Sequence, residues 1–401
     1  MSLPVHRWFR FSAGFSAQWA EHVIREAHLR EKVRLFDPFT GSGTALLAAE
    51  YVGTESYGIE AHPFVCRVAS AKLSWRMNPD LYLSQVQRLL RLATGIAPQI
   101  ESYPILIRRC FDDRTLSVLD TLRQAYLHLR DDSPASELLW LTLVTCLRKA
   151  SFVGTAQWQY ILPNKRKRSP LSPLAAFEEA AAMIYEDMQL GASIVGPKPR
   201  LFRGDARNCQ RIPIESINLI ITSPPYPNNY DYADATRLEM SFMGEINGWG
   251  DLQGTVRQYL IRSCTQHVPE GSHQLDTVLS DPLLTPIRDE ITEVCTHLAE
   301  IRNTKGGRKT YHLMIAAYFL DLAKTWHELR RVCVSPSRVC FVIGDSAPYG
   351  VYVPVIPWLG ALAIAAGFRR YSFDKIRDRN VKWKNRKHRV PLQEGHLWVE
   401  G

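Results

Sequence analysis

The sequence predicts an α/β fold, in which a largely parallel sheet carries helices on both faces and a long helical segment is inserted into the chain. Three observations predict it. A mostly apolar run at 33–36 leads through a glycine turn into a helix-forming stretch, a second mostly apolar run at 217–222 stops at two prolines, and residues 75–198 between them have a helical pattern almost throughout. Strands that alternate with helices in this way are typical of α/β domains.

The first apolar run ends in Asp37-Pro38-Phe39-Thr40-Gly41-Ser42-Gly43-Thr44, after which 45–51 are strong helix formers. Gly41 and Gly43 carry no side chain, so the backbone N–H groups of this turn can approach a ligand closely. We therefore expect a ligand-binding turn between a buried strand and a helix.

The second apolar run ends in Thr222-Ser223-Pro224-Pro225-Tyr226. Two consecutive prolines cannot continue the hydrogen bonds of a sheet, so the chain must leave the sheet here. It leaves at the carboxyl edge of the strand, where open α/β sheets bind their ligands.

Together the two stretches resemble the amino-group DNA methyltransferases that use S-adenosylmethionine, and the resemblance implies their Rossmann-like methyltransferase sheet. The first is similar to the family's cofactor motif, and the cofactor-binding residues that it implies are Asp37, Pro38, Phe39, Gly41, Gly43 and Thr44. The second is similar to the catalytic motif in its Ser-Pro-Pro-Tyr form, which the family mostly associates with N4 of cytosine. The catalytic residues that it implies are Ser223, Pro224, Pro225 and Tyr226.

Four further residues resemble the family's cofactor contacts. Phe15 and Ser16, ahead of a helical pattern from 17 to 29, resemble the motif that closes over the methionine end of the cofactor; core packing and helix capping are the alternatives. Glu60 ends the strand at 56–60, roughly 20 residues after Asp37, where an acid accepts hydrogen bonds from ribose hydroxyls. Asp205 resembles the acid that contacts the adenine amino group, with helix capping as the alternative.

An exocyclic amino group on a base is a poor nucleophile, because its lone pair is delocalised into the ring. Acceptors aimed at its N–H protons, here the Ser223 hydroxyl and the Pro224 carbonyl, turn the nitrogen towards sp³ and direct its lone pair at the methyl group. Tyr226 offers a flat face for a base flipped out of the duplex. Methylation at carbon 5 of cytosine would need a cysteine after a proline, and the chain contains no Pro-Cys dipeptide.

The chain has 49 Lys and Arg against 40 Asp and Glu, a formal charge of +9, which favours a polyanionic partner. The positive charge is concentrated at 165–168 and 369–389, the second interleaved with Tyr371, Phe373 and Trp383. Solvated loops are the alternative, but basic and aromatic residues together suit phosphates and bases. The predicted DNA contacts are Lys165, Arg166, Lys167, Arg168, Arg377, Arg379, Lys382, Lys384, Arg386 and Lys387.

The pattern divides the chain into five parts. Residues 1–74 form the cofactor half, 75–198 a helical insertion, 199–243 the catalytic half, 244–307 a second insertion and 308–401 the rest of the sheet. We expect helices at 81–93, 116–129, 137–150, 174–190, 286–301, 311–332 and 357–366, and strands at 338–343 and 396–399. In the family, target-recognition segments are inserted between motifs, so both insertions and 369–389 are candidate readers of the target sequence.

Several classes of protein are excluded. No run of about 18 apolar residues exists, so we expect no membrane span. The eight cysteines are scattered without metal-binding spacing, which predicts free thiols in a reducing cytoplasm and no metal.

The leading hypothesis is a DNA N4-cytosine methyltransferase of a bacterial, archaeal or phage modification or defence system. Its cofactor is S-adenosylmethionine and its partners are double-stranded DNA and a companion nuclease. Two alternatives remain open at this point. One is an N6-adenine DNA methyltransferase or an RNA methyltransferase, and the other is a methylase-like DNA-binding subunit that does not turn over.

Overall fold

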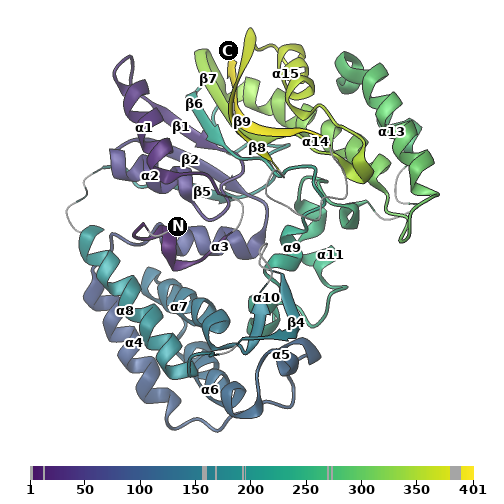
Figure 1. The fold of residues 1–401 in the computed structure, drawn as a ribbon. Coiled ribbons are helices and arrows are strands. Elements are labelled where there is room, and N and C mark those ends of the chain that lie inside the picture. The colour runs from purple at the N-terminus through teal and green to yellow at the C-terminus, as the bar shows by residue number, and fades with distance from the viewer. Residues whose placement is uncertain are drawn as a thin grey trace.

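A computed structural model describes residues 3–11, 14–155, 160–167, 169–191, 194, 196–268, 271, 274–379 and 390–401. A seven-stranded sheet lies at its centre, in the order β5-β2-β1-β6-β7-β9-β8 (Figure 1). The strands are β1 (Arg34–Asp37), β2 (Glu55–Glu60), β5 (Arg200–Arg203), β6 (Ile217–Thr222), β7 (Cys333–Gly344), β8 (Arg370–Arg379) and β9 (Leu392–Glu400).

The strands from β5 to β7 in that order are parallel, whereas β9 runs antiparallel to both β7 and β8. This sheet confirms the predicted α/β, Rossmann-like fold.

Helices cover both faces of the sheet, because its buried strands are apolar at successive positions and successive side chains point to opposite faces. Leu35 of β1 packs into the core beneath α1 (Ala17–His28) and α2 (Thr44–Val52). The next residue, Phe36, packs into the opposite core with α14 (Tyr311–Val332) and α15 (Val355–Ala365). Figure 1 shows these pairs on the two sides, with α3 (Pro63–Lys72) beside α2.

The predicted insertion is a bundle of helices below the sheet in Figure 1. The four predicted helices are present, and α5 is a fifth; a hairpin of β3 and β4 follows α7. Asp112 and Ser133 cap α6 and α7 with their side chains. The elements are α4 (Pro79–Ala93), α5 (Ile105–Cys110), α6 (Asp113–Leu129), α7 (Pro134–Ala150), β3 (Val153–Thr155), β4 (Ile161–Arg166) and α8 (Pro173–Gly191).

The bundle shares one apolar core with parts of the chain on either side of it in sequence. Trp8 from the N-terminal segment, Phe64 of α3 and Phe242 from beyond the catalytic motif all pack into this core. Residues 244–307 are divided between two cores: Leu252 packs with the bundle, whereas Ile291 packs against the α14 face of the sheet.

The connections after β6 consist of short helices. These are α9 (Tyr232–Ala235), α10 (Arg237–Met243), α11 (Leu252–Thr255), α12 (Leu275–Leu279) and the longer α13 (Arg288–Arg302), together with the 3-10 segments η2 (Arg257–Tyr259), η3 (Thr265–His267) and η4 (Pro282–Ile287). Two further 3-10 segments are η1 (His6–Trp8), before α1, and η5 (Pro348–Gly350), after β7.

Strand β8 was not expected from the sequence, which placed its residues in a basic exposed segment. It forms the edge of the sheet beside β9. Its charges are partly neutralised there, because Arg370 pairs with Glu400 at 2.7 Å and Arg377 pairs with Glu394 at 2.7 Å. Charged side chains are a common protection of exposed sheet edges, and they conceal the apolar alternation of a strand.

The eight cysteines are free, as the scattered spacing predicted. Among the helices of the described residues, none is both long and apolar enough to cross a membrane.

Candidate active site

The glycine turn and the proline pair lie side by side at one edge of the sheet, because β1 and β6 are neighbouring parallel strands. Leu35 is paired with Leu219 and Phe36 with Ile220. At the ends of these strands, the Thr222 hydroxyl donates a hydrogen bond of 2.5 Å to Asp37 Oδ1. Two segments far apart in the sequence therefore meet where open α/β sheets bind ligands.

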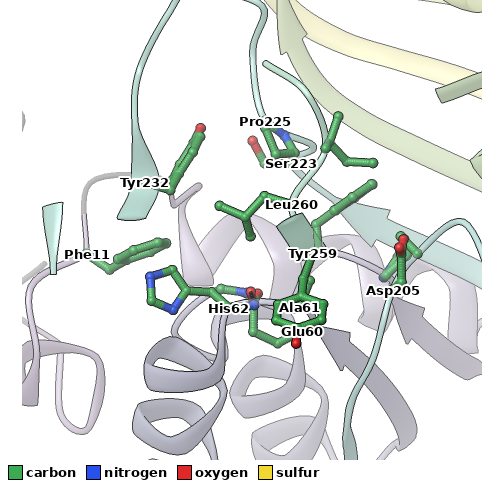
Figure 2. A pocket seen from close by; sticks show the side chains of 15 residues that line it. Phe11, Glu60, Ala61, His62, Asp205, Ser223, Pro225, Tyr232, Tyr259 and Leu260 are labelled. Carbon is green, nitrogen blue, oxygen red and sulfur yellow. Dashed lines mark hydrogen bonds between the residues drawn. The ribbon is translucent and has the colours of Figure 1, made fainter. Parts of the chain in front are cut away.

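An open cavity lies between these segments; its empty space, open solvent included, is about 600 Å³. Figure 2 shows Phe11, Tyr232, Ser223 and Leu260 around it, with Glu60 and His62 below. The lining residues are Phe11, Pro38, Phe39, Gly41, Glu60, Ala61, His62, Asp205, Ala206, Ser223, Pro225, Tyr232, Tyr259, Leu260 and Ile261.

The glycine turn is fixed to the end of β2. Gly41 (φ 53°) and Gly43 (φ 94°) are in the left-handed region, which favours glycine. The N–H of Gly41 donates to Glu60 Oε2 at 2.7 Å, and the N–H of His62 donates to Oε1 at 2.8 Å. The Glu60 carboxyl is thus held at the cavity wall in one orientation.

Two buried carboxyl groups lie at this edge. Asp37 accepts from the Phe39 N–H at 3.0 Å and from Thr222, but its Oδ2 is buried without a hydrogen-bond partner among the described residues. Burial raises the pKa of Asp37 to about 7 and that of Glu60 to about 7, because water no longer stabilises their charged forms. Both groups titrate near neutral pH.

In the catalytic motif, Ser223 and Pro225 line the cavity. The Ser223 hydroxyl donates to the Val342 carbonyl at 3.1 Å, so its oxygen keeps lone pairs that can accept. Pro224 is buried, and among the described residues no N–H is seen to donate to its carbonyl. The Ser223 oxygen can therefore accept at the cavity, whereas Pro224 is not among the residues that line it.

Tyr226 is half-buried and packs against the core on the α14 face. It is not among the residues that line the cavity. The guanidinium of Arg379 lies over its ring, with Cζ 5.1 Å from the ring centroid. Tyr232, six positions further along, does line the cavity.

The N-terminal residues of the predicted cofactor site lie elsewhere. Ser16 is the N-cap of α1 and accepts from the Trp19 N–H at 3.3 Å, while the Phe15 ring packs edge-on against Trp19. Neither lines the cavity, whereas Phe11 does. Of the glycine turn, Pro38, Phe39 and Gly41 line it, and Gly43 and Thr44 lie behind them at the start of α2.

Asp205 lines the cavity, but it is also paired with an arginine. Arg207 donates from Nε to Asp205 Oδ1 at 2.9 Å and from Nη2 to Oδ2 at 2.6 Å. Its Nη1 lies 3.0 Å from Asp321 of α14. This ion-pair network connects β5 to α14 beneath the cavity wall, and no sequence motif indicated it.

Sequence reasoning missed other lining residues. His62 lies two positions after Glu60, and burial lowers the pKa of its imidazole to about 3, so the ring is neutral. Its Nε2 lies 3.0 Å from the Thr236 hydroxyl. The position of His62 after the strand acid was the only signal available for it. No sequence pattern indicated residues 259–261 as part of the site, because they reach the cavity only through the packing of η2.

The predicted DNA-contacting residues are spread over two regions. Lys165 and Arg166 are exposed on β4, and the Arg166 guanidinium lies over the Phe152 ring at 5.1 Å. Lys167 is half-buried and donates to the Arg148 carbonyl; burial lowers its pKa. Arg377 and Arg379 belong to β8. Arg168, Lys382, Lys384, Arg386 and Lys387 lie outside the described residues.

Comparison with known proteins adds a family context. The type II methyltransferase M.BsoBI of Geobacillus stearothermophilus is 25% identical over 94% of this chain and 81% of its own length. The type II methyltransferases M.AvaI of Nostoc sp. strain PCC 7120 and of Anabaena variabilis are each 24% identical over 92% of this chain and 80% of their own length. No family model and no solved structure matches. The similarity extends over most of the chain, and it supports placing the protein in a DNA methyltransferase family.

Proposed function

We propose that this protein is an S-adenosylmethionine-dependent DNA methyltransferase that modifies the exocyclic N4 amino group of cytosine within a specific sequence, as part of a modification or defence system. One observation carries the proposal. The glycine turn after β1 and the Ser-Pro-Pro-Tyr segment after β6 line the same cavity at the carboxyl edge of the sheet. A cofactor motif and an amino-base motif have to meet in this way for a methyl group to pass between them.

The residues at the cavity fit the cofactor. Gly41 leaves the wall open to close approach, Glu60 presents a carboxyl suited to ribose hydroxyls, and Asp205 presents an acceptor suited to an amino group. The unpartnered Oδ2 of Asp37 marks a buried acceptor beside them. When bound, S-adenosylmethionine supplies an electrophilic methyl group on a sulfonium sulfur.

The catalytic motif fits an amino base. The Ser223 oxygen and the Pro224 carbonyl accept from the two N–H protons of the amino group, which directs the nitrogen lone pair at the methyl carbon. With the cofactor bound, the amino nitrogen held by these acceptors would take the methyl group directly in a single displacement from sulfur, and the surplus amino proton would pass to solvent. The base must first leave the duplex, because Ser223 lines the cavity and cannot enter a base stack.

The choice of DNA as substrate follows from the relatives, which are type II methyltransferases, and from the basic residues on the surface. Lys165 and Arg166 on the exposed hairpin, and Arg377 on β8, are proposed phosphate contacts. The helical insertion and residues 244–307 are the proposed readers of the target sequence.

Incubation with methyl-labelled cofactor and DNA of mixed sequence, followed by digestion to nucleosides, tests the proposal. We expect label in N4-methylcytosine and within one sequence context. Label in N6-methyladenine would show that the target base is adenine and not cytosine. Label in RNA alone would show that DNA is not the substrate. Tight cofactor binding without transfer to any nucleic acid would indicate a non-catalytic subunit.

A further inference from the structure

We propose that Arg379 is a placeholder for the target base: in the free protein its guanidinium covers a face of the Tyr226 ring, and the flipped base displaces it in order to stack there. The inference rests on the proposed function, since it concerns how the base reaches the catalytic motif. It also gives Arg379 a different role from the other basic residues, which were expected to contact phosphates.

Arg379 is held over the ring from three directions. Its Cζ lies 5.1 Å from the Tyr226 ring centroid. Its Nη1 donates to the Asp345 carbonyl at 2.8 Å, and its Nε lies 3.5 Å from the Glu394 carboxylate. The side chain is only 16% exposed. An arginine placed to contact the DNA backbone would instead project into solvent.

The end of β7 leaves room for this arginine. A Cβ atom at Gly344 would come within 2.8 Å of the Gln393 carbonyl oxygen, 3.0 Å of Arg379 Cδ and 3.2 Å of its Nη1. A side chain at position 344 would thus crowd both the backbone of β9 and the guanidinium. Gly344, the Asp345 carbonyl and the Glu394 carboxylate together define the position of the Arg379 guanidinium.

Arg379 covers a face of the half-buried Tyr226 ring. Tyr226 is packed against the core of the α14 face, which leaves only part of the ring accessible. A guanidinium resembles a pyrimidine in being flat and delocalised, and both stack on aromatic rings. Arg379 therefore covers the stacking surface in the free protein, and an incoming base can displace it.

The energies permit such an exchange. A cation over an aromatic ring changes an equilibrium constant by about 2- to 30-fold, and a base stacked on an aromatic side chain by about 5- to 100-fold. The base can displace the arginine, but loss of the contact between arginine and ring offsets part of the free energy gained when the base stacks. Removal of Arg379 should restore that part.

Arg377 is a matched control on the same strand. It pairs with the same acid, Glu394, at 2.7 Å, but its side chain is 66% exposed, and no contact with the Tyr226 ring is seen among the described residues. Removing Arg377 deletes the same charge without uncovering the ring.

The experiment compares two duplexes, one with the target base and one with an abasic site in its place. The target sequence is first mapped from the DNA that the wild-type enzyme methylates. Dissociation constants are then measured with S-adenosylhomocysteine, so that no transfer occurs. The ratio of the abasic constant to the base-containing constant isolates the stacking step, because the phosphate contacts are common to both duplexes.

We expect this ratio to rise about three- to tenfold in Arg379→Ala and in Arg379→Gln, and to keep the wild-type value in Arg377→Ala. The glutamine variant retains much of the side-chain length and guards against a change of fold. An unchanged or lower ratio in both Arg379 variants, or an equal rise in Arg377→Ala, would overturn the inference alone. Absence of methyl transfer by the wild-type enzyme would instead overturn the proposed function, and this inference with it.

Discussion

Single residues determine the chemistry of the cavity, and the two buried carboxyl groups show how. Asp37 and Glu60 end neighbouring strands, and each is held by backbone N–H groups that fix its orientation. Their burial raises both pKa values to about 7. Groups with such pKa values are concentrated at functional sites, so cofactor binding should be sensitive to pH near neutrality.

Glu60→Gln tests the pH dependence. The pKa of Glu60 is raised, so the carboxyl is protonated below about pH 7 and ionised above it. The ionised form accepts from both ribose hydroxyls, so the affinity for S-adenosylmethionine should rise with pH up to about 7 and then level off. Calorimetric titration from pH 5.5 to 8.5 should show this rise, by up to about tenfold per pH unit below 7.

In Glu60→Gln the rise attributed to Glu60 should disappear, while any contribution of Asp37 remains. The affinity at pH 8 should fall by about tenfold, because an amide is a weaker acceptor. A pH profile identical to that of the wild type would show that Glu60 does not contact the cofactor.

Ser223→Ala removes one of the two proposed acceptors of the amino group. We expect kcat to fall by about 10- to 1,000-fold, the range for loss of one preorganised group, while the cofactor affinity stays unchanged. Single-turnover transfer and calorimetry measure the two quantities. Ser216→Ala is the control, since its hydroxyl bonds the Pro213 carbonyl at the opposite end of β6. Equal activity of both variants would show that Ser223 takes no part in methyl transfer.

Tyr226→Ala should lose most turnover and retain cofactor binding, because Tyr226 offers the stacking face but does not line the cavity. Tyr232, six positions further along the chain, is an aromatic residue that does line it. An unchanged rate in Tyr226→Ala, together with a lowered rate in Tyr232→Phe or Tyr232→Ala, would show that the base stacks on Tyr232 and not on Tyr226.

At the scale of elements, the N-terminal segment joins the bundle to the sheet. Asp187 of α8 is buried and accepts from the Val5 N–H at 2.9 Å, from Trp8 Nε1 at 2.8 Å and from Arg7 at 2.6 Å. These bonds hold the segment that carries Phe11 to the cavity wall. The position of Phe11 is therefore set by a helix far away in the sequence.

Asp187→Ala should lower the free energy of unfolding by about 3 kcal/mol, because several buried donors lose their acceptor. It should also weaken cofactor binding, since Phe11 is no longer held in place. Urea denaturation and calorimetry measure these effects, with the exposed neighbour Glu186→Ala as the control. A loss of stability without any change in cofactor affinity would show that the segment does not order the cavity.

The elements also show what the sequence can predict. The glycine turn, the proline pair and Glu60 were predictable, because each is a local pattern at the end of an apolar strand. The helix at 311–332 was found with the predicted bounds. By contrast, β8 was missed because its charged residues conceal the strand pattern, and Phe11, Tyr232 and Tyr259 reach the cavity only through long-range packing. Such contacts have no local signature.

At the scale of the whole molecule, the net charge of +9 is a weaker guide than its placement. Several arginines that count toward it are neutralised, such as Arg207 by Asp205 and Asp321, and Arg148 by Glu239. The exposed cations of the β3–β4 hairpin are a better indication of where DNA lies. The hairpin is close to the catalytic segment, since the Asp231 N–H donates to the Tyr160 hydroxyl at 2.6 Å.

The double variant Lys165→Ala, Arg166→Ala should weaken binding to DNA of any sequence. The slope of log K against log salt should become shallower by about 2, because two phosphate contacts are lost. Fluorescence anisotropy at several salt concentrations measures this slope. Lys149→Ala is the control, because Lys149 pairs with Glu179 at 3.0 Å. An unchanged slope in the double variant would place DNA elsewhere on the surface.

The central claim is that the cavity between the glycine turn and Ser-Pro-Pro-Tyr transfers a methyl group to N4 of cytosine. The most direct measurement uses cofactor with a ¹³C-labelled methyl group and DNA with ¹⁵N at the cytosine amino group, followed by nuclear magnetic resonance of the product nucleosides. We predict a one-bond coupling between the labelled carbon and the labelled nitrogen, which Ser223→Ala strongly reduces. A labelled methyl group on adenine, on carbon 5 of cytosine or on no nucleoside would contradict the claim.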